Sequence, residues 1–260
     1  MKKTLIESIP LPLPKEIEDF VSGTSVYDSS CSPEARVYFI KKGNGYYLKS
    51  APSGTLRKEA EMASYFHSKG LGVPVLHYSS HDGKDWLLSE GADGEDCTHY
   101  LEDPKRLCDT IAENLRALHE LFAADCPIKD RCADYIKLVE ENRTLGKYDP
   151  SLFDGEFSFK DADEAYSVFC EGKDGLSSDV LLHGDYCLPN IILKDWAFSA
   201  FIDLGNGGIG DRHIDLFWGA WTLRFNLGTD AYRERFFDAY GRDNLDKDLL
   251  RLVAAAEAFG

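Results

Sequence analysis

The sequence lacks the features that mark several classes of protein. Met1 to Pro14 contains two lysines but neither a continuous apolar stretch nor a small-residue cleavage site, so we expect no secretory leader, no spanning helix and a cytoplasmic location. The seven cysteines form no Cys-x-x-Cys pair and no cluster with histidine at zinc spacing, and their odd number argues against a complete disulfide framework. We therefore expect reduced thiols that mostly serve packing.

Basic residues are also scarce, because 29 lysines and arginines face 45 aspartates and glutamates, which gives a formal charge of −16. Nucleic acid is bound through clustered basic side chains, so this balance argues against a nucleic-acid partner. It suits a cationic ligand, although acidity that simply keeps the protein soluble explains the charge equally well. No membrane partner is expected, and the chain is expected to be a monomer or a weak homodimer.

The hydrophobic period changes once along the chain. Up to Ser89 the segments are short, rich in β-branched and aromatic residues and bounded by turn residues, which indicates strands. We predict four strands, at 35–41, 46–50, 73–78 and 85–89. Asn44-Gly45 predicts a hairpin turn in which both residues adopt positive φ. Leu56 to Lys69 lacks glycine and proline and predicts one helix, which Gly70 ends.

After Gly94 the pattern is helical. Apolar residues from Leu107 to Phe122 recur at the spacing of one helix face. Further helices are predicted near 132–145, 161–171, 211–226, 230–240 and 246–258, and three short buried strands at 180–182, 191–194 and 200–204. The fold class is therefore α+β, with a small β-rich lobe (1–88), a hinge (89–94) and a larger helical lobe (95–260).

A group of polar residues interrupts the helical part. His183 to Asn190 is followed by Asp203 at the end of an apolar strand. Phosphoryl transfer needs a carboxylate that orients the acceptor hydroxyl, and hard oxygen ligands that hold a metal ion. Asp185 supplies the carboxylate, and Asn190 and Asp203 supply the metal ligands, at the Asp-x-x-x-x-Asn spacing of a kinase catalytic loop. The alternative is two unrelated turns with structural aspartates.

These motifs resemble the aminoglycoside phosphotransferase family, most closely its 3'-phosphotransferase branch, over nearly the whole chain. The resemblance implies a bilobal, protein-kinase-like fold that uses ATP and Mg²⁺. It also implies that Ser32 lies at the tip of a loop over the phosphates and that Lys49 contacts the α- and β-phosphates. Glu59 is the implied partner of Lys49, with Glu61 as the fallback; their helix could equally be a solvated charged face.

The same resemblance extends to the adenine and substrate sites. Backbone groups of Ser89 and Gly91 would recognise adenine at the hinge. The stretch 149–179 has nine acidic and two basic residues. In it Asp154 and Glu156 resemble the acidic substrate loop, and the C-terminal helix adds Glu257, although a solvated acidic face would look the same.

The sequence departs from the family pattern at the substrate side. Asn206 occupies the substrate-side position of an arginine in close relatives, and a charged Arg-x-Ile-x-Glu-Asp pattern is replaced around Trp221 and Phe225. The chain also continues one residue beyond Phe259, where some relatives end. These departures leave the nucleotide, metal and base residues intact and affect the expected affinity for the antibiotic and the choice of hydroxyl.

Four other residues near the predicted site are expected to be structural. His119 is predicted to be a hydrogen-bonded core histidine, Cys187 a packing residue with no base within reach in the sequence, and His183 the residue that orients the loop. Asp215 resembles the structural aspartate of the family.

We therefore expect an ATP-dependent O-phosphotransferase that acts on a hydroxyl of a cationic small molecule, an aminoglycoside, at the 3' position. One alternative is a kinase of the same fold that acts on a sugar, an amino alcohol or a macrolide. A second is a nucleotide-binding protein that has lost transfer. A third is metal-dependent hydrolysis by His183, Asp185 and Asp203, which would not need Lys49.

Overall fold

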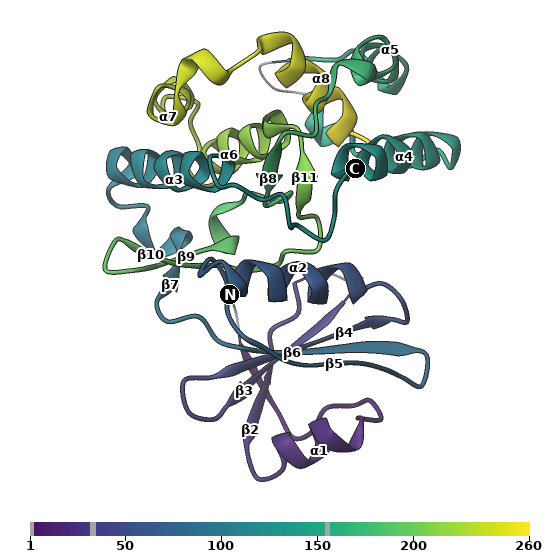
Figure 1. The fold of residues 1–260 in the computed structure, drawn as a ribbon, viewed down its shortest axis with the longest axis vertical. Coiled ribbons are helices and arrows are strands. Elements are labelled where there is room, and N and C mark those ends of the chain that lie inside the picture. Colours follow the sequence, from purple (N-terminus) through teal and green to yellow (C-terminus); the bar gives the residue numbers. More distant parts are fainter. Residues whose placement is uncertain (1–2, 32–34, 154–156) are drawn as a thin grey trace. The chain divides into compact units, whose positions relative to one another are not determined.

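The computed structural model describes residues 3–31, 35–153 and 157–260, which form a mixed α and β structure (Figure 1). The chain divides into two compact units. The sheet unit comprises Met1–Cys97 and Pro189–Gly205, and the helical unit comprises Thr98–Leu188 and Asn206–Gly260. Pro189–Gly205 lies with the sheet unit although it is far from Met1–Cys97 in the sequence.

A six-stranded antiparallel sheet forms most of the sheet unit, in the order β1-β2-β3-β4-β6-β5. Its strands are β1 (Thr4–Ile6), β2 (Ser25–Asp28), β3 (Arg36–Lys41), β4 (Tyr46–Pro52), β5 (Val75–His81) and β6 (Lys84–Glu90). Side chains alternate between the two faces of a strand, so Leu48 and Lys49 on β4 point to opposite sides. Leu48 therefore belongs to the apolar core on one face of the sheet, and Lys49 places a charge on the other face.

Each face of this sheet is covered by a helix. The first face packs Tyr38, Leu48 and Trp86 against the N-terminal segment and α1 (Lys15–Val21). The second face packs Ala51 and Leu87 against α2 (Arg57–Ser68). Figure 1 shows α1 and α2 on opposite sides of the strands.

A second, small sheet completes the sheet unit. It is formed by β7 (Glu95–Asp96), β9 (Ile191–Lys194) and β10 (Ala197–Phe201), in the order β10-β9-β7. The amide of Phe201 donates to the carbonyl of Leu71 at 2.8 Å, and its ring lies edge-on to Phe66 of α2. These contacts explain why the segment 189–205 lies with the sheet unit.

The helical unit packs several of its helices around an apolar core. Its helices are α3 (Pro104–His119), α4 (Arg131–Thr144), α5 (Ala162–Gly172), α6 (Arg212–Leu227), α7 (Arg233–Tyr240) and α8 (Lys247–Glu257). The short strands β8 (Val180–Leu182) and β11 (Gly208–Gly210) pair antiparallel. Helix α3 packs on α6 and α7, and α8 packs on α5 and α6. Val253, Ala255 and Phe169 lie at the centre of this core.

Three local predictions are corrected by the structure. The β3–β4 hairpin is present, but the positive φ angles occur at Gly43 and Gly45 and not at Asn44. Helix α3 ends at His119, so Phe122 is not on its buried face and is 84% exposed. Strand β10 ends at Phe201, four residues after Ala197, and does not extend to Leu204.

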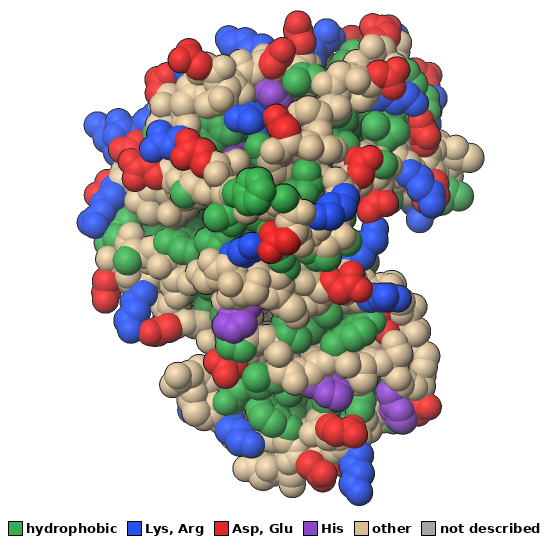
Figure 2. All heavy atoms as spheres, viewed as in Figure 1, with side chains coloured by type: hydrophobic (Ala, Val, Ile, Leu, Met, Phe, Trp, Pro, Cys, Tyr) green, Lys and Arg blue, Asp and Glu red, His purple; other side chains and the backbone are tan. Residues whose placement is uncertain are grey.

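All seven cysteines are free, and four of them are buried. In the part of the chain that the structure describes, no helix has the length and apolarity needed to cross a membrane. On the face shown in Figure 2, acidic and basic side chains are interspersed, with hydrophobic side chains exposed among them.

Candidate active site

Lys49 is the centre of an ion-pair cluster in the sheet unit. Its Nζ lies 3.0 and 2.8 Å from the two carboxylate oxygens of Glu59, in the first turn of α2. The same Nζ lies 2.8 Å from Oδ1 of Asp203, which follows β10. The alternation of β4 directs Lys49 to the α2 face, and the contact between Phe201 and α2 brings Asp203 to it. Three residues far apart in the sequence therefore meet around one ammonium group.

The electrostatics of this cluster keep Lys49 charged. Burial on its own lowers the pKa of Lys49, but the carboxylates of Glu59 and Asp203 outweigh it and raise the pKa above its ordinary value. The side chains of Lys49 and Glu59 are 21% and 11% exposed, whereas that of Asp203 is 51% exposed. The pair between Lys49 and Glu59 expected from the sequence is present. Glu61, the fallback, instead pairs with Arg57 on the surface of α2.

The segments that carry Asn190 and Asp203 are joined by a backbone hydrogen bond. The amide of Ile202 donates to the carbonyl of Asn190 at 3.0 Å, which joins the segment before β9 to the segment after β10. Asp203 has φ of 59°, in the left-handed region that non-glycine residues seldom adopt. Such strain concentrates at functional sites, so this carboxylate is a good candidate for a working residue.

The loop that carries Asp185 is held in the helical unit by Asp215, in the first turn of α6. The two oxygens of this buried carboxylate accept from the amides of His183 at 2.8 Å and Gly184 at 2.7 Å. Nε2 of His119 on α3 lies 3.1 Å from Oδ2 of the same carboxylate, and Nδ1 of His119 lies 2.8 Å from the hydroxyl of Tyr240. The expected structural roles of Asp215 and His119 are confirmed.

Three further bonds fix the loop around Asp185. The amide of Asp185 donates to Nδ1 of His183 at 3.3 Å, and the hydroxyl of Tyr186 donates to the carbonyl of Ile111 at 2.7 Å. The amide of Leu188 donates to Oγ1 of Thr222 on α6 at 3.1 Å. These bonds hold the backbone while the Asp185 side chain stays part-exposed.

Glycine is required at one position in this loop. Gly184 has φ of 84°, and a Cβ placed there would lie 2.0 Å from the carbonyl oxygen of Asn206.

Cys187, two residues after Asp185, is a poor nucleophile because burial raises the pKa of its thiol. The expected packing role of Cys187 agrees with this environment.

Glu257, predicted on the substrate side, is only 7% exposed. Burial raises the pKa of Glu257 to about 7, while hydrogen bonds from Tyr135 and Trp218 and the charge of Arg131 act in the opposite direction. The hydroxyl of Tyr135 lies 3.0 Å from the Glu257 carboxylate, and the Asp185 charge contributes to the raised pKa. A carboxyl in this setting is largely hydrogen-bonded within the protein.

Asn206, the other predicted substrate residue in the described part of this unit, is bonded to Arg131. The guanidinium of Arg131 donates to the Asn206 carbonyl at 2.9 Å and to its side-chain oxygen at 3.1 Å. Sequence reasoning missed Arg131, Tyr135 and Trp218. Their partners lie 39 or more residues away in the chain, so no local pattern could have revealed them.

The remaining predicted site residues are less informative. Ser32, Asp154 and Glu156 lie outside the described residues. Ser89 is paired in β6 between Tyr47 and Val75, and the amide of Gly91 donates to the carbonyl of Gly45 at 2.9 Å. Among residues 3–31, 35–153 and 157–260 no group of three or more His, Cys, Asp or Glu side chains could hold a metal ion.

Comparison with known proteins identifies the family. Residues 33–252 match the family of phosphotransferase enzymes. The chain is 52% identical over 249 residues to a probable aminoglycoside 3'-phosphotransferase of Lactococcus lactis subsp. lactis, covering 95% of each chain. It is 34% identical to an aminoglycoside 3'-phosphotransferase of Niallia circulans, covering 86% of this chain and 87% of that protein.

Solved structures confirm the expected fold. An aminoglycoside phosphotransferase of Streptomyces rimosus superimposes with a TM-score of 0.76 at 23% identity, covering 94% of this chain and 95% of that one. A type VIII aminoglycoside-3'-phosphotransferase gives a TM-score of 0.76 at 22% identity, with 95% and 97% covered. The sheet and helical parts predicted from the sequence are those of these kinase-like structures. With the family match and the relatives above, the chain belongs to the phosphotransferase enzyme family.

Proposed function

We propose that this chain is an ATP-dependent O-phosphotransferase that phosphorylates the 3'-hydroxyl of an aminoglycoside. The cluster of Lys49, Glu59 and Asp203 carries the proposal, because a charged lysine held between two carboxylates fits phosphate binding beside a metal ligand. The relatives named as aminoglycoside 3'-phosphotransferases support the acceptor class. Free cysteines and the use of ATP suit a cytoplasmic enzyme.

The sheet unit would bind the nucleotide. Lys49 would contact the α- and β-phosphates while Glu59 holds its ammonium group in place. Ser32 would contribute from the loop before β3. Backbone groups of Ser89 and Gly91 would recognise adenine, and because the Gly91 amide already donates to Gly45, Gly91 would use its carbonyl. In this proposal residues 1–88 form the lobe that binds ATP, and residues 89–94 form the hinge. Residues 95–260 form the lobe that carries out catalysis and binds the acceptor.

Asn190 and Asp203 would hold magnesium. The donor set fits, because carboxylate and amide oxygens suit Mg²⁺, and the Asp203 side chain is exposed enough to exchange its ammonium partner for a metal. When bound with ATP, the ion would supply charge neutralisation at the phosphates. Lys49, released from Asp203, would then contact the nucleotide.

Asp185 would act on the acceptor. Its loop is fixed by the Asp215 carboxylate, so the Asp185 side chain can orient a hydroxyl towards the phosphate and take up its proton. Asp154, Glu156, Asn206 and Glu257 would contact the substrate. Asn206 is bonded to Arg131 and Glu257 is buried, so the direct pairing with ammonium groups would fall to the acidic loop.

The proposal is tested by ADP release with ATP, magnesium and a panel of aminoglycosides, sugars and choline. Turnover with aminoglycosides that carry a 3'-hydroxyl is expected, and Asp185→Asn should lower kcat at least ~100-fold. Asp174→Asn, at an exposed aspartate of the same unit, should leave kcat unchanged. Near-normal turnover of the Asp185 variant would refute its role, and ADP release only with sugars or choline would replace the acceptor class.

A further inference from the structure

An aromatic row runs along one face of α6. Trp218, Trp221 and Phe225 follow one another at the spacing of three and four residues that places side chains on the same side of a helix. The ring centroids of Trp218 and Trp221 are 5.3 Å apart, with the planes at 79°. Those of Trp221 and Phe225 are 4.9 Å apart and inclined by only 12°, so the two rings are stacked.

This row lies beside the residue of α6 that contacts the Asp185 loop. Thr222, next to Trp221, accepts the amide of Leu188, three residues after Asp185. Trp218 donates a hydrogen bond to Glu257, whose raised pKa includes a contribution from the Asp185 charge. The aromatic row therefore begins beside the acceptor-side carboxylates and continues away from them along α6.

Phe225 ends the row with a large exposed surface. It is 69% exposed, one of the highest values among the large hydrophobic side chains of the described chain. Because Trp221 covers one face of its ring, the exposed surface includes the other face. An exposed aromatic ring that is held in place by stacking costs little conformational entropy when it binds a second ring.

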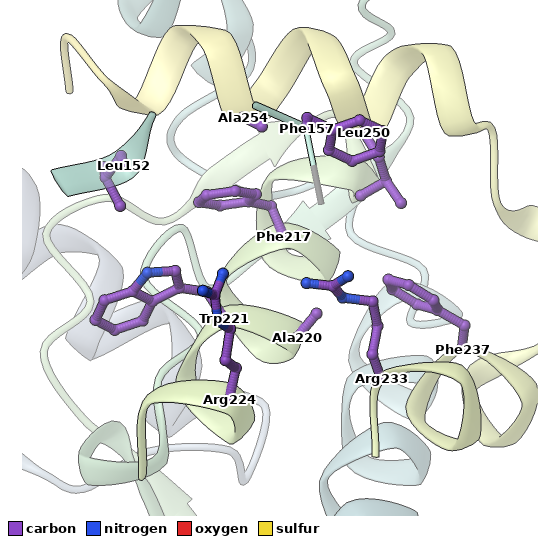
Figure 3. Close-up of a pocket in the computed structure, with 10 residues that line it drawn as sticks. All are labelled: Leu152, Phe157, Phe217, Ala220, Trp221, Arg224, Arg233, Phe237, Leu250 and Ala254. Carbon is purple, nitrogen blue, oxygen red and sulfur yellow. The ribbon is translucent and has the colours of Figure 1, made fainter. Parts of the chain in front are cut away.

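Trp221 contacts the ring of Trp218 and also borders a pocket. With Arg224, it forms one end of a pocket whose walls also include Phe217 of α6, Leu250 of α8 and Leu152 (Figure 3). The pocket has a cavity volume of only about 50 Å³, which is too small for a sugar ring. The pocket is therefore too small to be the binding surface, and the surface open to a ligand is the stacked pair of Trp221 and Phe225.

We infer that Trp221 and Phe225 form an aromatic platform on which a ring of the acceptor stacks. The inference rests on the proposed function and refines its substrate: the acceptor is selected by a flat C–H face of a sugar ring more than by its number of ammonium groups. Uncharged aromatic side chains contribute dispersion and burial to such a ring, and salt does not screen this attraction.

Two aminoglycosides provide a matched test. Neomycin and paromomycin have the same rings and differ by one ammonium group, which is a hydroxyl in paromomycin. Phe225→Ala should raise the acceptor KM about threefold to tenfold for both compounds, with kcat and the KM for ATP unchanged. Phe225→Tyr should restore the wild-type KM, and Phe122→Ala, at a ring that is 84% exposed elsewhere in the helical unit, should have no effect.

The opposite outcomes are equally clear. An unchanged KM in Phe225→Ala, or a rise for neomycin alone, would overturn the platform. If the wild-type protein releases no ADP with either compound, the proposed function fails separately. In that case, calorimetric titration of the two compounds into wild-type protein and Phe225→Ala tests the platform directly. Weaker binding by the variant supports the platform. Equal binding by the two proteins, or undetectable binding by both, overturns it. Trp221→Phe, with its Tm measured, repeats the test at the second ring.

Discussion

At the scale of single residues, the same charge has different consequences in different surroundings. Glu59 is held against the ammonium of Lys49, Glu61 two residues later pairs with Arg57 at the surface, and Glu257 is buried among hydrogen-bond donors. The sequence could suggest Glu59 only through family resemblance, because residues 57–61 are nearly all charged. Which carboxylate faces inward depends on how α2 packs on the sheet.

The two glutamates of α2 give a matched pair of variants. Glu59→Gln removes the carboxylate that positions Lys49, so we expect the KM for ATP to rise about tenfold, the effect of a loss near 1.4 kcal/mol. Glu61→Gln removes only an exposed pair, which contributes little. Steady-state kinetics at varied ATP measure both. Equal KM values for the two variants would show that the Lys49–Glu59 pair has no role in nucleotide binding.

Glu257 predicts a pH dependence of stability. Its pKa is about 7 in the folded protein and 4.5 in the reference state, so the folded protein binds this proton more tightly. The resulting stabilisation is complete below pH 4.5 and is lost as the pH rises to about 7. At 1.36 kcal/mol per pKa unit the loss is about 3 kcal/mol.

Glu257→Gln should remove this contribution. The free energy of unfolding of the variant minus that of the wild type, both measured in urea, should increase between pH 5 and pH 8. A constant difference between the two proteins over that range would mean that Glu257 does not titrate there.

At the scale of elements, regular patterns were predictable and tight turns were not. The strands from β3 to β6 and helix α2 follow from their periodicity. Helix α1 has only seven residues and was missed with β1 and β2, because so short a segment shows no clear period. Strand β10 was placed too late because Ile202 and Leu204 are apolar, whereas Asp195 and Trp196 make a two-residue turn with positive φ.

The candidate site was predictable to a similar extent. Spacing predicts Asp185, Asn190 and Asp203 as site residues, and resemblance predicts Lys49, which the structure places beside Asp203. Contacts that join distant elements were not predictable, such as the pairing of Arg131 with Asn206 over 75 residues. When two contacting side chains are distant in the sequence, the residues next to either one show no pattern that predicts the contact.

Helix α6 holds the Asp185 loop through Asp215, which leads to a prediction about one carboxylate. Asp215→Asn leaves one backbone amide of His183 or Gly184 without an acceptor, so we expect a loss of about 1–3 kcal/mol in the free energy of unfolding. A fall in kcat of tenfold or more should accompany it, because the Asp185 loop loses its anchor. Urea unfolding and turnover measure the two effects.

Asp161→Asn is the control for this variant. Asp161 also accepts two backbone amides, at the exposed start of α5, and an asparagine caps a helix nearly as well. It should change stability by less than about 0.5 kcal/mol and leave kcat intact. If both variants lose turnover equally, the effect of Asp215 is not specific to the loop.

At the scale of the whole molecule, the excess of acidic residues determines the net charge. The formal charge of the chain is −16, and acidic and basic side chains are interspersed on the face seen in Figure 2. Self-repulsion of a net charge destabilises the compact state, and salt screens it, with a Debye length of about 10 Å at 0.1 M. Overall charge therefore sets how the protein responds to its solution, while the site depends on a few paired groups.

We expect the Tm to rise by a few degrees between low and moderate sodium chloride, measured by calorimetry. Potassium chloride should give the same rise, because screening does not depend on the identity of the monovalent ion. A falling Tm would mean that the ion pairs at the surface, such as Arg235 with Asp109, outweigh the repulsion.

The buried cysteines make the two units separately observable. Cys97 lies in the sheet unit, and Cys108, Cys126 and Cys132 lie in the helical unit. Burial raises the pKa of each of these thiols, so alkylation must wait until the surrounding structure opens. Mass spectrometry of peptides after timed exposure to iodoacetamide would give an opening rate for each unit from the natural sequence, without any introduced label.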